Sequence, residues 1–112
     1  MNVCLIGDSL TNLVLAKILA NKNIKATIFY DPNRKNKFFS RTIGISKNNF
    51  DFFIDQVLDI EKISWPIKSI KVFNELSLED EILNFGANNS KLLLIIKYNQ
   101  LFNLLIKNVV NN

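Results

Sequence analysis

The chain has 112 residues, of which 48% are hydrophobic and 21% charged, with a net charge of +4 and no histidine. This composition is typical of one globular domain with a modest core, and no apolar run reaches the ~18 residues of a membrane span. Without histidine the sequence offers no Ser-His-Asp or Cys-His arrangement and no ordinary zinc site. The positive charge comes mostly from lysines scattered along the chain, which does not predict a nucleic-acid surface.

The first 31 residues predict a βαβ unit. A short apolar run from Asn2 to Ile6 ends at Gly7, and an apolar helical stretch follows from Leu10 to Ala20. A second strand-like run from Lys25 to Tyr30 ends at Asp31. We expect the two strands to lie parallel in one sheet, joined through the helix, as at the start of a dinucleotide-binding fold. The turn after the first strand would then direct backbone N–H groups and a helix N-terminus at a pyrophosphate.

The fingerprint of that turn is incomplete. The full pattern is G-x-G-x-x-G, and here Gly7 supplies the tight turn while Ser9 and Asn12 replace the second and third glycines. The second glycine normally admits the phosphate to the backbone, and the third lets the helix pack close to the strand. In the full pattern an acidic residue at the end of the second strand binds the ribose. Here that position holds Tyr30, and Asp31 follows one place later.

The only cysteine, Cys4, lies inside the first predicted strand. We expect it to be a small buried apolar residue rather than a nucleophile. A single cysteine allows no internal disulfide, which agrees with a reducing compartment. Met1 leads straight into the strand with no basic and apolar signal segment, so we expect a cytoplasmic protein.

The rest of the sequence predicts further strands and helices, and we interpret the chain as a single α/β region. After a polar loop, Arg41 to Ser46 is strand-like and Ser46 can cap the next helix. The remaining expected elements, in order, are a helix over 47–58, a connector over 60–66, a strand over 67–74, a polar connection over 75–80, a strand over 81–85, a turn over 86–90, a strand over 91–97 and a helix from about 99. We expect the apolar face of that last helix to be uncovered, so that residues 1–112 form an incomplete domain.

Four segments in this order resemble the N-terminal region of flavoprotein aromatic hydroxylases related to para-hydroxybenzoate hydroxylase, and most of all the ubiquinone-biosynthesis hydroxylases. The first is the βαβ unit up to Tyr30, and the second is Arg41 to Ser46 (RTIGIS), which is similar to the family's R-[ST]-[IV]-[AG]-[LI]-S segment. The third is Trp65 to Val72, similar to its P-[IV]-x-x-[IM]-x-V strand, and the fourth is Leu94 to Leu101, similar to its strand ending in V-x-x-[NR]-x-x-L.

The resemblance implies an enzyme that binds FAD, takes a hydride from NAD(P)H and uses O₂ to hydroxylate an activated aromatic ring. It implies that Gly7, Ser9 and Asn12 line the pyrophosphate turn, that Tyr30 and Asp31 face the adenosine ribose, and that Arg41 reaches the flavin side. It assigns no catalytic residue and no metal ligand to this chain, because the family's later Gly-Asp flavin segment and most of its substrate pocket have no counterpart in these 112 residues. The chain alone is therefore not expected to be a competent enzyme.

Two other functions stay open at the level of sequence. The chain could be a degenerate βαβ module that holds no cofactor and works through a partner chain. It could also touch a membrane surface through the segment from Leu92 to Val110, although that apolar face is more simply explained as core. We expect its partners to be either the remaining part of the enzyme or further copies of itself.

Overall fold

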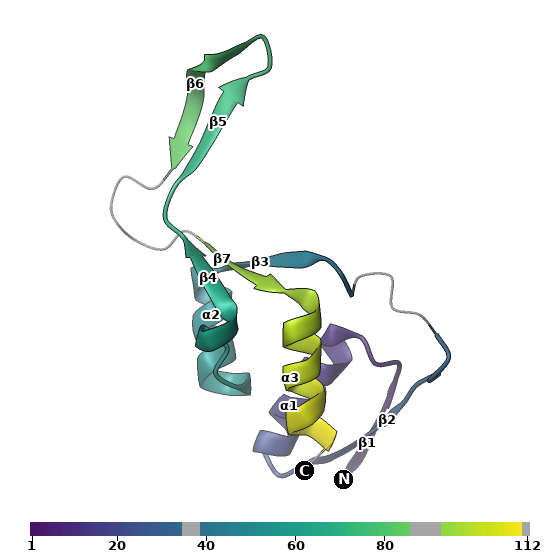
Figure 1. Cartoon of the computed structure of the whole chain (residues 1–112). Helices are drawn as coiled ribbons and strands as arrows, with labels where there is room; N and C mark the ends of the chain where they lie inside the picture. The colour runs from purple at the N-terminus through teal and green to yellow at the C-terminus, as the bar shows by residue number, and fades with distance from the viewer. Residues whose placement is uncertain (35–38, 86–92, 111–112) are drawn as a thin grey trace.

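The computed structural model describes residues 1–34, 39–85 and 93–110 (Figure 1). They form the expected mixture of strands and helices. The elements are β1 (Asn2–Ile6), α1 (Leu10–Asn21), β2 (Lys25–Phe29), β3 (Thr42–Ser46), α2 (Lys47–Phe52), β4 (Ser64–Ile67), β5 (Ile70–Asn74), β6 (Ser77–Phe85), β7 (Leu93–Lys97) and α3 (Tyr98–Val110). A π-helical turn over Phe53–Val57 extends α2, and a 3₁₀ turn over Glu61–Ile63 precedes β4.

The predicted βαβ unit is confirmed. Strands β1 and β2 pair in parallel, with a register that runs from Asn2 opposite Lys25 to Ile6 opposite Phe29. Helix α1 connects them and ends where Asn23 adopts a left-handed conformation with φ +60°. Asparagine is one of the few residues that tolerates this region, which allows the helix to stop and turn into β2.

The second sheet is antiparallel and has the order β3-β7-β4. Its middle strand, β7, has Leu94 and Ile96 fully buried on one face. Ser46 ends β3 and at the same time caps α2, because its hydroxyl accepts a hydrogen bond from the Asn49 N–H at 3.2 Å. Tyr98 begins α3 directly after β7, and its N–H donates to the Arg41 carbonyl at 2.8 Å.

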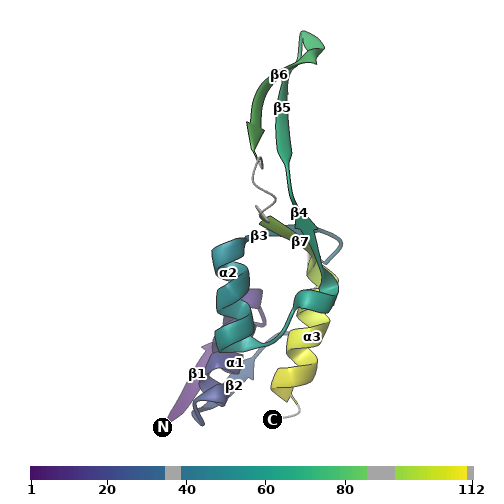
Figure 2. The ribbon, with the colours of Figure 1, turned by 90° about the vertical axis from the view of Figure 1, so that its left-hand side faces the viewer.

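The third sheet is a hairpin of β5 and β6 that projects beyond the second sheet in both views (Figures 1 and 2). It gives the molecule extents of 56 × 31 × 21 Å and a radius of gyration of 17.6 Å. A compact chain of this length would have a radius of gyration of about 13 Å. Several apolar residues of the hairpin are exposed, and Leu76 at its tip is 90% exposed. A two-stranded hairpin that projects in this way receives little stabilisation from packing against the core.

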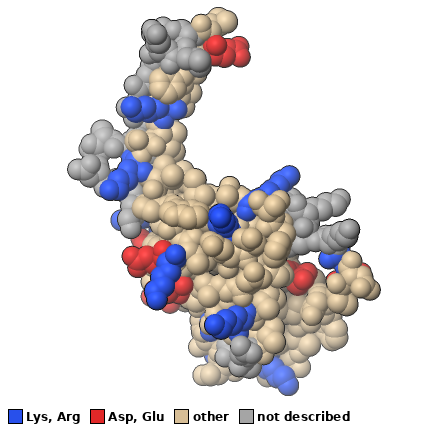
Figure 3. All heavy atoms as spheres, viewed as in Figure 1, with Lys and Arg blue, Asp and Glu red and all other residues tan. Residues whose placement is uncertain are grey.

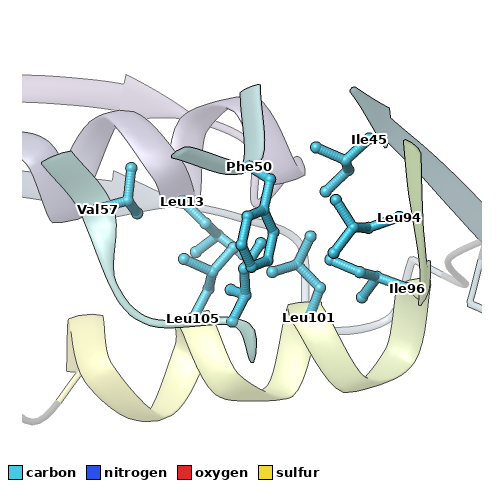
Figure 4. Close-up of a cluster of buried hydrophobic side chains, with 9 residues drawn as sticks. Leu13, Ile45, Phe50, Val57, Leu94, Ile96, Leu101 and Leu105 are labelled. Atoms are coloured by element: carbon cyan, nitrogen blue, oxygen red, sulfur yellow. The ribbon is translucent and has the colours of Figure 1, made fainter. Parts of the chain in front are cut away.

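One hydrophobic core joins α1, α2, the second sheet and α3 (Figure 4). Leu13 of α1 and Leu105 of α3 are 1% and 0% exposed. The buried members of this core are Leu13, Ile45, Phe50, Val57, Ile60, Leu94, Ile96, Leu101 and Leu105. The expectation that the apolar face of the last helix is uncovered is therefore wrong, because α1 and β7 pack against it.

The uncovered surface lies instead on the first sheet. Helix α1 lies against one face, where Leu5 is buried, and the opposite face presents Cys4 and Ile6, the latter 86% exposed. The expectation that Cys4 is buried is thus wrong, because strand alternation places it on the face that no described element covers. Strands of parallel sheets are normally buried on both faces. The accessible surface is 8452 Å², whereas a compact monomer of this mass would expose about 6,300 Å².

Three other expectations need correction. The residues expected to be a connector include a strand, β4, and the single strand expected over 67–74 is two strands, since β4 ends at Ile67 and β5 begins at Ile70. The polar connection expected over 75–80 is the tight end of the hairpin, because β6 already begins at Ser77. The turn expected over 86–90 lies outside the described residues.

No helix in the described part of the chain is long and apolar enough to cross a membrane. Lysine and arginine side chains are spread singly over the face shown in Figure 3, between large uncharged areas. Across residues 1–34, 39–85 and 93–110 there is also no group of three or more His, Cys, Asp or Glu side chains suited to a metal ion.

Candidate functional site

The turn between β1 and α1 requires a glycine at its first position. Gly7 has φ +97°, a conformation that favours glycine, and its N–H donates to the Phe29 carbonyl at 2.6 Å. A Cβ built on Gly7 would lie 3.8 Å from its nearest neighbour, Asn12 Nδ2, which is ordinary contact. Glycine is therefore needed here for its conformation and not for space.

Ser9 is the N-cap of α1. Its hydroxyl accepts a hydrogen bond from the Asn12 N–H at 3.2 Å, and its carbonyl accepts from the Leu13 N–H at 2.9 Å. The N–H groups of Leu10 and Thr11, in the first turn, have no partner within the helix, as at every helix start. Together with the helix dipole, they make this end of α1 attractive to an anion.

Asn12 ties the helix to the end of β1. Its side-chain Nδ2 donates to the Ile6 carbonyl at 2.9 Å and to the Gly7 carbonyl at 3.0 Å. A glycine at this position would bring the two backbones close but would leave both carbonyls without this donor. Asparagine in place of the third glycine therefore replaces close packing of the two backbones with two side-chain hydrogen bonds across the turn.

A hollow of about 410 Å³ lies at the carboxyl ends of β1 and β2. It brings Gly7 together with Tyr30 and Asp31, as the sequence predicts for the adenosine end of a dinucleotide. Asp8, Arg34, Ile6 and Phe29 complete its lining. Ligands of parallel sheets bind at this edge, beyond the carboxyl ends of the strands.

Arg34 is a lining residue that the sequence analysis does not assign to the site. Asp31 bends the chain after β2, since its carboxylate accepts from the Asn33 N–H at 2.9 Å and its carbonyl accepts from the Arg34 N–H at 3.2 Å. With this turn, Arg34 lines the same hollow as Gly7. The signal in the sequence is the turn-forming run Asp31-Pro32-Asn33, which places residue 34 near residue 31.

Arg41 lies elsewhere. It is exposed, immediately precedes β3 in the second sheet, and does not line the hollow that holds Gly7 and Tyr30. A second hollow of about 380 Å³ lies between the first turns of α1, strand β3 and helix α2. Its lining is mostly apolar and consists of Leu10, Thr11, Val14, Ile43, Gly44, Ile45, Asn49, Phe52, Phe53 and Leu101. Leu10 and Thr11, which follow the Gly7 turn in the chain, line this apolar hollow and not the one that holds Arg34.

These residues fit one end of FAD better than the other. A glycine turn, two unpaired helix N–H groups and the Arg34 guanidinium suit a pyrophosphate, and an apolar hollow beyond them suits a ring. Asp31 already accepts the Asn33 N–H with one carboxylate oxygen, so the other oxygen remains for a ribose hydroxyl. No charged group of the described residues lines the apolar hollow.

Comparison with known proteins shows the fold. No protein-family model matches the sequence, and no curated protein does. The structure is similar to that of 2,6-dihydroxypyridine-3-hydroxylase from Arthrobacter nicotinovorans, with a TM-score of 0.69 over 95% of this chain and 15% identity. The likeness covers 26% of the hydroxylase chain, so this chain spans about a quarter of that protein. A Rossmann-like unit followed by further strands and helices is thus the fold.

Proposed function

We propose that this chain is the FAD-binding N-terminal part of a flavin-dependent aromatic hydroxylase. The observation that carries the proposal is the Gly7 turn, which opens α1 onto a hollow shared by Tyr30, Asp31 and Arg34. The fold likeness to a hydroxylase that acts on a dihydroxypyridine ring supports the same class. When bound, FAD would supply the redox chemistry, with NAD(P)H as the proposed reductant and an aromatic ring as the substrate.

Within that function, this chain's residues hold the nucleotide end of the cofactor. The Leu10 and Thr11 N–H groups and the Arg34 guanidinium would face the pyrophosphate, and Asp31 would face the ribose. The segment that resembles the hydroxylases from Arg41 to Ser46 borders the apolar hollow, which agrees with a role on the flavin side. The four family-like segments further support a place in ubiquinone biosynthesis, in the cytoplasm.

A second candidate function is a βαβ module that holds no cofactor and acts through a partner chain. The observation that favours it is Asn12, whose amide bonds to Ile6 and Gly7 occupy the inside of the turn. A turn closed in this way is stable without a phosphate. Contact with a membrane through α3 has no such support, because Leu101 and Leu105 are buried in the core.

Binding of ADP distinguishes the two functions. A few N–H bonds worth about 1 kcal/mol each, plus one guanidinium, fall short of the ~8 kcal/mol that micromolar affinity needs. We therefore expect ADP to bind with a dissociation constant nearer millimolar and to shift the backbone amide NMR signals of Gly7, Leu10 and Thr11. The Arg34→Ala variant should weaken this binding severalfold, while Arg41→Ala should leave it unchanged.

Two results would contradict the hydroxylase proposal. One is the absence of any amide shift at the Gly7 turn with 10-fold more ADP than the expected constant, which would favour the module without cofactor. The other is a neighbouring reading frame, or a continuation of this one, that lacks a Gly-Asp flavin segment. A continuation that contains this segment should make the longer protein yellow.

A further inference from the structure

We propose that Asn12 is a positioning residue, which turns the peptide group between Gly7 and Asp8 so that the Asp8 N–H faces the hollow that would receive the pyrophosphate. The ligand in this inference rests on the proposed function, whereas the geometry rests on hydrogen bonds within the turn. The fingerprint has a glycine at the place of Asn12, so the sequence alone indicates a weakened site. In the structure the Asn12 side chain restrains the turn in a way that a glycine cannot.

The Asn12 amide fixes the orientation of two successive peptide groups. Its Nδ2 lies 2.9 Å from the Ile6 carbonyl oxygen and 3.0 Å from the Gly7 carbonyl oxygen, so both carbonyls point toward the start of α1. In a planar trans peptide group the N–H points opposite to the C=O. The Gly7 N–H and the Asp8 N–H therefore both point away from Asn12.

One of these two N–H groups has a partner, and the other does not. The Gly7 N–H donates to the Phe29 carbonyl at the end of β2, at 2.6 Å. The Asp8 N–H makes no hydrogen bond within the described part of the chain. Asp8 lines the hollow at the carboxyl ends of β1 and β2, and Asn12 does not. The Asp8 N–H is therefore a donor that remains available to a ligand in that hollow.

The peptide group between Gly7 and Asp8 needs this restraint because of the glycine. Gly7 has φ +97°, and glycine adopts both signs of φ about equally readily. Without the Asn12 amide, the Gly7 backbone would also allow the opposite orientation, in which the Gly7 carbonyl oxygen faces the hollow. A carbonyl oxygen there would repel a phosphate, whereas an N–H attracts it.

The charges around the hollow make a correctly directed N–H important. Arg34 is the only cationic side chain among the described residues that line it, while Asp8 and Asp31 bring two carboxylates. Side-chain charge alone therefore does not favour an anion, and fixed N–H groups must contribute the rest. Loss of one such hydrogen bond corresponds to about fivefold weaker binding.

ADP binding, followed by backbone amide NMR signals, tests the contact with the ligand. In the unmodified protein the Asp8 signal should shift with ADP. Asn12→Gly, which restores the fingerprint, and Asn12→Ala should each weaken ADP binding about fivefold. Asn21→Ala is the matched control, because the Nδ2 of Asn21 in α1 also donates to two successive carbonyls, those of Gln56 and Val57, at 3.1 Å each. It removes the same number of hydrogen bonds away from the turn and should leave ADP affinity unchanged, with circular dichroism to correct for unfolded protein.

Residual dipolar couplings test the orientation of the peptide group without any ligand, since they report the direction of each N–H in the folded protein. The Asp8 coupling of the unmodified protein should fit the structure. In Asn12→Ala and Asn12→Gly it should depart from that fit, while the couplings in α3 stay unchanged. In Asn21→Ala the Asp8 coupling should keep its original value.

Three results would overturn the proposal. Equal or tighter ADP binding by Asn12→Gly would show that the amide has no positioning role. An unchanged Asp8 coupling in both Asn12 variants would show that another group fixes the peptide. An equal loss of ADP affinity in Asn21→Ala would reduce the effect to general destabilisation. By contrast, an Asp8 coupling that depends on Asn12, in a protein whose signals ignore ADP, would refute the proposed function and the phosphate contact but not the orientation, so the two failures are distinguishable.

Discussion

Replacing Asn12 by alanine should destabilise the protein, although alanine is the better helix former. The change removes the two hydrogen bonds to the Ile6 and Gly7 carbonyls. At about 1 kcal/mol each they contribute roughly 2 kcal/mol. The gain in helix propensity offsets about 0.5 kcal/mol, which leaves a net loss of about 1.5 kcal/mol.

The chain contains a matched control for this prediction. Ser46 and Asn49 repeat the arrangement of Ser9 and Asn12, with an N-cap hydroxyl that accepts the N–H three residues later at 3.2 Å in both helices. Asn49 is exposed, and its side-chain amide makes no hydrogen bond within the described part of the chain, where only its backbone groups are bonded. Asn49→Ala should therefore be neutral or stabilising by a few tenths of a kcal/mol.

Urea unfolding followed by circular dichroism measures both variants, at one protein concentration because association shifts the midpoint. In a thermal scan the Asn12→Ala loss corresponds to a melting temperature lower by about 6 °C. Equal effects of the two alanine variants would refute the argument that the amide of Asn12 closes the turn. So would a larger loss for Asn49→Ala.

Three more outcomes follow from the structure and can be measured in the same assays. Gly7→Ala should cost about 1–2 kcal/mol because of its positive φ, whereas Gly44→Ala, whose Cβ would lie 3.6 Å from Leu93 Cδ1, should cost much less. Leu105→Ala should cost about 2–5 kcal/mol as a core truncation, while Val110→Ala, 70% exposed, should cost under 0.5 kcal/mol. Trp65 is 53% exposed, so acrylamide should quench its fluorescence readily in the folded protein. Quenching as slow as that of a fully buried tryptophan would contradict this position.

The sequence predicts the first half of the fold well because its signals are local. The runs that form β1, α1 and β2 end at Gly7, at the Asn21–Asn23 segment and at Asp31, and each of these carries its own turn chemistry. The cap at Ser46 is equally local and places the start of α2 correctly. Short-range rules suffice where a residue's neighbours in sequence decide its conformation.

The expectations that fail depend on contacts between distant segments. Alternation predicts that Cys4 and Leu5 face opposite ways, but not which face another element covers. Likewise, the periodicity of α3 shows its apolar face, and only the fold shows that α1 covers it. The start of β6 is predicted four residues too late because the strand begins in the polar run 77–80, where pairing with β5 overrides weak strand propensity.

In the candidate site, too, local signals could be read from the sequence and contacts between distant residues could not. Gly7, Tyr30 and Asp31 could be named from their order along the chain, and the structure brings them together. The roles of Asn12 and Arg34 could not be predicted in this way, because each depends on the direction of a side chain in the folded structure. Arg41 can be singled out only by resemblance, and its position in the second sheet leaves its role on the flavin side a proposal.

The contact between α1 and α3 also bears on how the protein matures during synthesis. Leu13 is buried against a helix whose central residue, Leu105, is made about 90 residues later. At ribosomal rates of about 5–20 residues per second, α1 waits roughly 5–18 s for the helix that covers it. Throughout that interval the nascent βαβ unit leaves its inner face without the helix that later covers it, so this part of the chain is more open to chaperones and proteases than the finished fold.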